Sequence, residues 1–179
     1  MVKLSQQYTM KINKDGSPMM SEKEIKLIDY LIESIKPEVC LEWGAGNSTI
    51  YFPKKHNCIK SWLAVEHNEN YVKYLKDKVS NKVKINTFII ESDPYYIDCI
   101  EENKYDFILI DGLYREECLE KAMKVAKQDA LILLHDSGRK EYQAFIKKYE
   151  GEELCEGEIL QRDGFYAHRG LTRFIKYED

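Results

Sequence analysis

The sequence lacks the features that mark membrane-spanning, secreted and disulfide-stabilised proteins. No apolar run approaches the roughly 20 residues that a membrane-spanning helix needs. Residues 1–20 have no continuous apolar stretch and carry three lysines, so no secretory signal is expected. The 5 cysteines are an odd number and include no CxxC pair, so no disulfide or zinc framework is expected. We therefore expect reduced thiols and a cytoplasmic protein.

An excess of charge of one sign is also missing. The chain has 27 Lys and Arg against 31 Asp and Glu, for a net charge of -4, and its basic residues are scattered. Nucleic-acid binding usually requires a dense basic surface, so a nucleic-acid partner is not expected. With 179 residues, 44% hydrophobic and 32% charged, the composition is that of an ordinary globular domain.

Short apolar strands alternate with helical segments along most of the chain. Ser21 and Glu24 have the spacing of a capping box, which predicts a helix that Pro37 ends. The expected strands are 39–41, 61–65, 83–90, 107–110, 131–134, 158–160 and 172–176, and later helices are expected at 96–102, 115–127 and 139–149. This pattern predicts a doubly wound α/β fold with a mostly parallel, Rossmann-like sheet and an antiparallel C-terminal edge.

Two parts of the chain differ in character. Residues 1–20 are expected to form an irregular arm with a turn at 15–18, and residues 21–179 a single folded domain. Met19 and Met20, at the end of the arm, would let it close over a bound ligand as a lid.

Acidic side chains stand where each of the five central strands ends. They are Glu42, Glu66, Asp93, Asp111 and Asp136. Any one of them could simply cap the following helix. Because ligands bind outside the carboxyl ends of the strands in an open α/β sheet, the ordered set predicts a binding site at this rim.

A glycine-rich turn, Gly44-Ala45-Gly46, follows the first strand and would let a ligand approach the backbone closely. A dinucleotide-binding fingerprint would have a third glycine where Thr49 stands. Glu42 would repel a pyrophosphate but suits a cationic group, such as the ammonium or sulfonium of S-adenosylmethionine. Glu66 lies about 20 residues beyond the turn, the spacing of an acid that binds ribose hydroxyls. The turn therefore favours S-adenosylmethionine over a nicotinamide cofactor.

Four segments of the sequence resemble the motifs of class I S-adenosylmethionine-dependent methyltransferases. They are LEWGAGNSTIYF, AVEHNENY, DFILIDG and LILLHDSGRKEY, within residues 24–149. The combination GNST, VEHN, IDG and HDxxR is most similar to the glucuronoxylan 4-O-methyltransferase-like group and related polysaccharide O-methyltransferases. The resemblance implies an enzyme that methylates a hydroxyl of a sugar, glycan or other small acceptor.

The resemblance also implies a set of cofactor-binding residues. They are Glu42, Gly44, Ala45, Gly46, Asn47, Ser48, Glu66, His67, Ser92, Asp93 and Asp111. Glu42 and the glycine-rich turn would hold the methionine moiety, with the next two residues beside it at a helix N-terminus. Glu66 and the adjacent histidine would bind the ribose. Asp93, with the preceding serine, would bind the adenine amino group, unless it caps a helix before Pro94.

Transfer to a hydroxyl requires alignment of the acceptor and a group that takes up its proton. Asp111, His135 and Asp136 are the catalytic candidates, with Asp111 as the base and the other two in support. Asp111 and Asp136 would alternatively bind a divalent cation that acidifies the hydroxyl. Ser137 stands where the metal-dependent relatives have Asp or Asn, so no metal is expected.

Three residues are predicted to contact the acceptor: Tyr114, the adjacent Arg115, and Arg139. Arg139 would bind an anionic acceptor such as a uronate, or would pair with Asp136 instead. Other interpretations remain open: a methyltransferase acting on protein, RNA or an amine, a non-catalytic S-adenosylmethionine-binding partner subunit, and a nicotinamide-dependent oxidoreductase. Glu42 and Thr49 argue against the last.

Overall fold

A computed structural model describes residues 13, 15–87, 93–100, 105–156, 159–162, 165–168 and 170–176, without side chains for 93–94, 159–162 and 165–168. The strands are β1 Val39–Trp43, β2 Ser61–Glu66, β3 Val83–Thr87, β4 Tyr105–Ile110, β5 Ala126–His135, β6 Glu152–Cys155, β7 Ile159–Arg162, β8 Phe165–His168 and β9 Leu171–Ile175. The helices are α1 Glu22–Ile35, α2 Asn47–Lys55, α3 Glu69–Leu75, α4 Asp93–Asp98, α5 Arg115–Val125 and α6 Gln143–Lys148, the last preceded by a 3-10 turn, Lys140–Tyr142. Among the described residues, no helix is long and apolar enough to cross a membrane.

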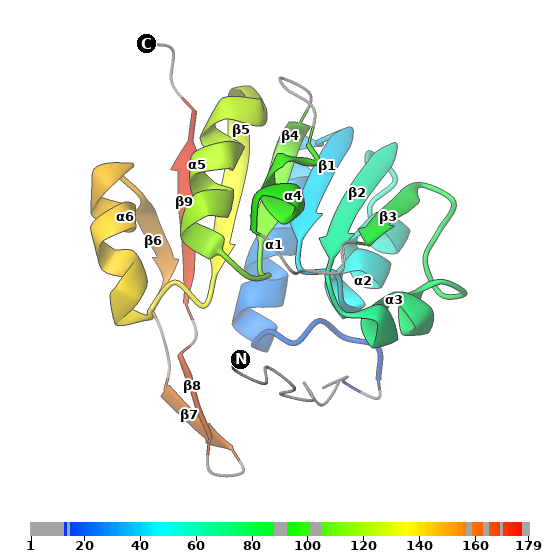
Figure 1. Ribbon diagram of the computed structural model, residues 1–179, viewed down its shortest axis with the longest axis horizontal. Coiled ribbons are helices and arrows are strands. Elements are labelled where there is room, and N and C mark those ends of the chain that lie inside the picture. The colour runs from blue at the N-terminus through cyan, green and yellow to red at the C-terminus, as the bar shows by residue number, and fades with distance from the viewer. Residues whose placement is uncertain are drawn as a thin grey trace.

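Seven strands form one sheet in the order β3-β2-β1-β4-β5-β9-β6 (Figure 1). The strands from β1 to β5 are parallel, and β9 runs antiparallel to both β5 and β6. The order reverses between β1 and β4, which places a ligand crevice at the carboxyl ends of these two strands. The prediction of a doubly wound, mostly parallel sheet is confirmed.

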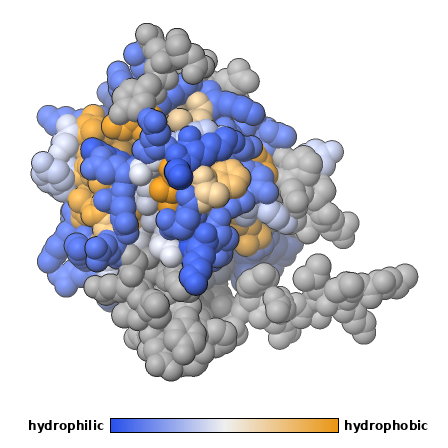
Figure 2. All heavy atoms as spheres, turned by 90° about the vertical axis from the view of Figure 1, so that its left-hand side faces the viewer, coloured by the Kyte–Doolittle hydropathy of each residue, from blue (hydrophilic) through white to orange (hydrophobic). Residues whose placement is uncertain are grey.

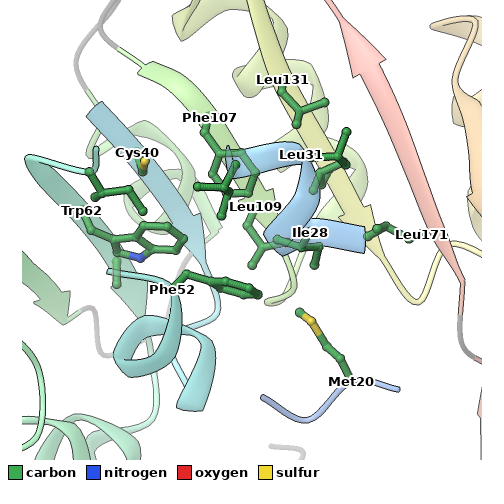
Figure 3. Close-up of a cluster of buried hydrophobic side chains, with 14 of the residues drawn as sticks. Met20, Ile28, Leu31, Cys40, Phe52, Trp62, Phe107, Leu109, Leu131 and Leu171 are labelled. Atoms are coloured by element: carbon green, nitrogen blue, oxygen red, sulfur yellow. The ribbon is translucent and has the colours of Figure 1, made fainter. Parts of the chain in front are cut away.

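Helices cover both faces of the sheet, and alternate strand residues pack against each set (Figure 1). On one face, Ile28 of α1 and Phe52 of α2 pack with Trp62, Phe107 and other strand side chains (Figure 3). On the other face, α4 and α5 cover a second cluster that includes Ile108. In a strand, successive side chains point to opposite faces, so strand position decides which helices a residue meets.

The start of α1 follows the predicted capping box. The hydroxyl of Ser21 accepts from the amide of Glu24 at 3.2 Å, and the Glu24 carboxylate accepts from the amide of Ser21 at 2.7 Å. At the other end, Lys36 adopts a left-handed conformation before Pro37, and the helix stops there.

The C-terminal edge of the sheet corrects one prediction. β9 forms the expected antiparallel strand, but the strand expected at 158–160 pairs only with β8, in a separate hairpin. The outer neighbour of β9 is β6, which the sequence did not predict. β6 is a short strand with exposed glutamates and no continuous apolar run. Figure 2 views the molecule from this side and shows a largely hydrophilic face with smaller apolar areas.

Several element boundaries also differ from the predictions. The helix expected at 96–102 is α4, Asp93–Asp98, and the strand expected at 131–134 is the longer β5, Ala126–His135. The helix expected at 115–127 ends at Val125, because β5 begins at Ala126. The helix expected at 139–149 is a 3-10 turn followed by the 6 residues of α6. The strand expected at 83–90 is described as far as Thr87, and the rest lies outside the described residues.

Candidate active site

A cavity of about 410 Å³ opens at the carboxyl ends of β1, β2 and β4. Its wall is formed by Met19, Gly44, Ala45, Gly46, Asn47, Ser48, Glu66, His67, Asn68, Tyr71, Asp111, Gly112, Leu113, Arg115 and Arg139. Most of the predicted site residues therefore meet around one space. Glu42, Tyr114, His135 and Asp136 are not part of this wall. Ser92 lies outside the described residues, and the side chain of Asp93 is not described.

Two glycines from neighbouring strand ends touch at the cavity. Gly44 has a φ of +98°, and a Cβ added to it would lie 2.5 Å from the amide nitrogen of Gly112. A Cβ on Gly112 would lie 2.9 Å from the nitrogen of Gly44. The backbone here accommodates no side chain at either position, so the turns after β1 and β4 approach each other closely and expose bare backbone to the cavity.

Glu42 lies beneath the glycine-rich turn and does not face the cavity. It is fully buried, and its carboxylate accepts hydrogen bonds from the Ser48 hydroxyl, from Thr49 Oγ1 at 2.6 Å and from Trp62 Nε1 at 2.9 Å. Burial raises the pKa of Glu42 to about 7, although these three donors oppose the shift. The predicted contact of this carboxylate with the methionine moiety is thus replaced by support of the turn.

The contacts of Thr49 explain why the third glycine of a dinucleotide-binding fingerprint is absent at this position. Oγ1 of Thr49 donates to Glu42 and also accepts from the amide of Gly46 at 3.0 Å. A glycine at this position would leave both groups without that partner. The side chain therefore closes the turn onto the start of α2.

Glu66 ends β2 at the cavity wall, as predicted. Its Oε1 accepts from the amides of His67 at 2.9 Å and Asn68 at 2.6 Å. Nδ1 of His67 lies 3.1 Å from the same oxygen. These contacts fix a nearly buried carboxylate in the wall of the cavity.

Asn47 connects the N-terminal arm to α2 and α3, a role that the sequence did not predict. Its Nδ2 donates to the carbonyl oxygens of Asn13 at 3.2 Å and Ser17 at 2.8 Å, and its Oδ1 accepts from Tyr74 at 3.1 Å. Met20 is buried in the core, whereas Met19 lines the cavity. The end of the arm thus forms part of the cavity wall.

Asp111 follows β4 and lines the cavity, whereas Glu66 lines it from the end of β2, on the other side of β1. Oδ1 of Asp111 accepts from His135 Nδ1 at 2.8 Å and from Arg115 at 3.1 Å. Burial works against ionisation, but these cations hold the pKa of Asp111 below its usual value. Burial also opposes charge on His135, yet the surrounding carboxylates raise the pKa of its imidazole to about 10. Both groups are therefore charged at neutral pH.

Arg115 binds backbone and carboxylate oxygens at two strand ends. Its Nε donates to the carbonyl of Gly112 at 2.9 Å, one terminal nitrogen donates to the carbonyl of His135, and the other donates to the carbonyl of Asp111 at 3.1 Å. The side chain is 8% exposed. These contacts fix the turn after β4 against the end of β5, and Arg115 also lines the cavity, so its contact with an acceptor stays a prediction.

Asp136 pairs with Arg139, which was the structural alternative for this arginine. The two side chains approach to 2.7 Å, and Asp136 adopts a φ of +53° after β5. The Arg139 side chain is 35% exposed and lines the cavity. It therefore remains able to contact a ligand while it pairs with Asp136.

In the metal alternative, a cation would have to replace ion pairs that these residues already form within the protein. Donor atoms of Asp111, His135 and Asp136 lie within 4.8 Å of one another. However, the His135 nitrogen nearest to Asp111 is hydrogen-bonded to it, and an imidazole must be neutral to ligate a metal. Arg115 and Arg139 already neutralise the two carboxylates. The donors are engaged with the protein's own cations.

No known protein family and no curated protein matches this sequence. Solved structures do resemble it. A protein assigned as an O-methyltransferase from Klebsiella pneumoniae has a TM-score of 0.70 at 14% identity, covering 90% of this chain and 84% of that one. One assigned as a caffeoyl-CoA O-methyltransferase from Staphylococcus aureus has a TM-score of 0.66 at 18% identity, covering 91% and 87%.

An O-methyltransferase from Bacillus cereus, in complex with SAH, has a TM-score of 0.64 at 14% identity, covering 88% and 82%. An N-methyltransferase from Bradyrhizobium japonicum has a TM-score of 0.61 at 14% identity, covering 88% and 96%. At these identities the likeness is one of fold. The chain has the Rossmann-like fold of these methyltransferases.

Proposed function

We propose that this chain is an S-adenosylmethionine-dependent methyltransferase that methylates a hydroxyl group of its acceptor. The observation that carries the proposal is the cavity at the carboxyl ends of β1, β2 and β4, where bare glycine backbone and the fixed carboxylate of Glu66 share one wall. The similar structures, one of them in complex with SAH, support the same cofactor.

The wall of the cavity suits this cofactor. The backbone of Gly44-Ala45-Gly46, with Asn47 and Ser48 at the start of α2, would hold the methionine moiety. Glu66 would accept hydrogen bonds from the ribose hydroxyls, with His67 beside it. Binding of the adenine amino group by Asp93 and Ser92 stays a prediction. The bound cofactor would supply a methyl group on a sulfonium.

A phosphate-bearing cofactor fits the same turn poorly. The amide of Gly46 donates to Thr49, so it does not point to a phosphate oxygen. Arg115 and Arg139 line the cavity, but both bind carboxylates at its other side. The turn therefore favours S-adenosylmethionine over a nicotinamide dinucleotide.

Asp111 is the carboxylate in position to receive a proton from an acceptor hydroxyl. It lines the cavity and, because its pKa is held below the usual value, it is ionised at neutral pH. A hydroxyl that donates to it would be oriented for attack, and its proton would pass to the Asp111 oxygen as the new bond forms. His135 and Asp136 lie behind Asp111 and hold it and its neighbours in place.

The acceptor class is proposed from the motif similarity to polysaccharide O-methyltransferases: a sugar or glycan hydroxyl. Arg139, exposed at the cavity, would contact an anionic group on it, and Tyr114, which caps α5 from just outside the cavity wall, would reach it only at the rim. The similar structures include O- and N-methyltransferases, so the fold alone leaves amine, protein and RNA acceptors and a non-catalytic partner subunit as alternatives.

Calorimetric titration with S-adenosylhomocysteine, with NAD in parallel, tests the proposal. Micromolar binding of S-adenosylhomocysteine alone is expected. Binding of NAD alone would make the chain a nicotinamide-dependent protein, and failure of folded protein to bind either would exclude this cavity as a cofactor site. With the cofactor established, Asp111→Asn should abolish transfer to sugar acceptors while most cofactor affinity remains.

A further inference from the structure

Glu24, in the first turn of α1, is fully buried, although the capping box alone would not require its burial. Its exposed fraction is 0%. Oε2 accepts from the amide and from the hydroxyl of Ser21, both at 2.7 Å, which completes the capping box. The box requires only this oxygen, so a second function is open to the other.

The second oxygen of Glu24 faces away from its own helix. Oε1 accepts from the amide of Gly170 at 3.1 Å, just before β9, and lies 3.6 Å from Nε2 of His135. Neither contact serves the helix terminus. The carboxylate therefore joins the start of α1 to the start of β9 and to the end of β5.

His135 lies between two carboxylates. Nδ1 is 2.8 Å from Oδ1 of Asp111, and Nε2 faces Glu24. The ring is 3% exposed and does not line the cavity, whereas Asp111 does. Among the described residues, Nε2 has no hydrogen-bond partner within 3.5 Å, so the 3.6 Å approach of Glu24 Oε1 is an ionic contact. A buried imidazolium is oriented by the carboxylates that face its two N–H groups.

We propose that Glu24 is a positioning residue: its carboxylate fixes the His135 ring so that Nδ1–H is donated to Asp111 at the cavity. The proposal rests on the proposed function, in which Asp111 receives the proton of the acceptor. Glu24, His135 and Asp111 then follow one another as carboxylate, imidazole and reacting group. An outer carboxylate orients an imidazole in the same way in catalytic triads.

Charged groups reach His135 from each element packed around it. Glu24 comes from α1, Asp111 follows β4, and Asp136 follows β5 with an oxygen 3.8 Å from Nδ1. Arg115 of α5 binds the carbonyl oxygen of His135 and the carboxylate of Asp111. Of these groups, Glu24 is the one that faces Nε2, so it alone is expected to fix that side of the ring.

Nitrogen-15 NMR of the full chain tests the proposal, with the His135 signals assigned by comparison with His135→Gln. In the wild type both ring nitrogens should carry protons at neutral pH. In Glu24→Gln, which keeps an oxygen for the capping box, the titration midpoint of His135 should fall by roughly one to three pH units. A bare Nε2 in the wild type would overturn the proposal even if the variant failed to fold.

Ser21→Ala is the matched control. It removes a hydrogen bond to Oε2 but leaves Oε1 facing His135, so the melting temperature should fall while the His135 titration stays unchanged. Equal titrations in Glu24→Gln and Ser21→Ala would leave Glu24 a purely structural role. S-adenosylhomocysteine affinity should match the wild type in both variants. If the wild type itself binds none, the proposed function fails, whereas the titrations still decide the role of Glu24.

Discussion

Burial of Glu42 makes the stability of the fold depend on pH. Burial raises its pKa from 4.5 to about 7, so between these values the folded state binds more protons than the unfolded state. The contribution of this group is then fully present below the unfolded pKa and is lost as the pH rises through the folded pKa. For Glu42→Gln, the free energy of unfolding relative to the wild type should rise by up to about 3 kcal/mol from acid to mildly alkaline pH.

Urea unfolding at several pH values measures this difference. Glu38→Gln is the control, because Glu38 is more than half exposed and forms only a surface ion pair with Lys60. The control difference should stay nearly constant with pH. If the difference for Glu42→Gln also stayed constant with pH, the pKa of Glu42 would be the same in the folded and unfolded states, and burial would not have raised it.

Glu66 is the residue whose loss should weaken cofactor binding most directly. Its carboxylate is held at the cavity wall by two backbone amides, so it is preorganised for the ribose hydroxyls. Glu66→Ala should weaken S-adenosylhomocysteine binding by roughly 1–3 kcal/mol, measured by calorimetry. Glu69→Ala, at the exposed first turn of α3, should bind as the wild type does. Equal affinity in the Glu66 variant would remove it from the site.

Strand alternation explains which site residues the sequence could place. The acids Glu66 and Asp111 were predicted at the rim, and both line the cavity. The sequence predicts that Glu42 follows its strand, but β1 continues to Trp43. Glu42 therefore lies on the same face as Cys40, which α1 and α2 cover. His135 is likewise the last residue of β5 and faces Glu24. An error of one or two residues in a strand end thus changes which way a side chain points.

At the scale of elements, the parallel strands β1, β2, β4 and β5 were predictable because each contains a continuous apolar run between helical segments, whereas β3 alternates apolar and polar residues. The antiparallel edge was less so: β6 has two exposed glutamates among its 4 residues, and its pairing with β9 depends on contacts distant in sequence. Contacts such as those of Arg115 and Asn47, which bind backbone oxygens of other elements, leave no periodic pattern in the sequence.

The N-terminal arm is the element whose predicted role as a lid can be tested through one residue. Asn47 holds the arm by two hydrogen bonds to Asn13 and Ser17, so Asn47→Ala should release it from α2. Amide exchange at residues 15–17 should then rise, and S-adenosylhomocysteine affinity should fall several-fold, because Met19 and the Asn47 side chain both lose their places in the wall.

Tyr74→Phe is the control for the Asn47 variant. It removes the hydroxyl that donates to Asn47 Oδ1 but leaves the two bonds to the arm, so both exchange and affinity should change little. If Asn47→Ala raised exchange without a change in affinity, the arm would be attached to the domain but would not act as a lid.

At the scale of the whole molecule, the cavity joins the two halves of the sheet. One wall comes from the turns after β1 and β2, and the other from the turn after β4 and from Arg139 beyond β5. A ligand that contacts both walls binds only the folded chain and stabilises it by mass action. At a concentration of S-adenosylhomocysteine 100 times its Kd, the gain is about 2.7 kcal/mol. For a domain of this size, that should raise the Tm by about 5 to 10 °C.

Scanning calorimetry separates this coupling from weak surface binding. At the same ligand concentration, Glu66→Ala should show a smaller rise in Tm, because its Kd is higher, and NAD should produce none. Amide exchange should slow both at residues 44–48 and at 111–113, since the ligand touches both turns. Protection confined to the first turn would place the ligand against β1 and α2 alone. The turn that carries Asp111 would then not contact the bound ligand, and the role proposed for this carboxylate in methyl transfer would lose its support.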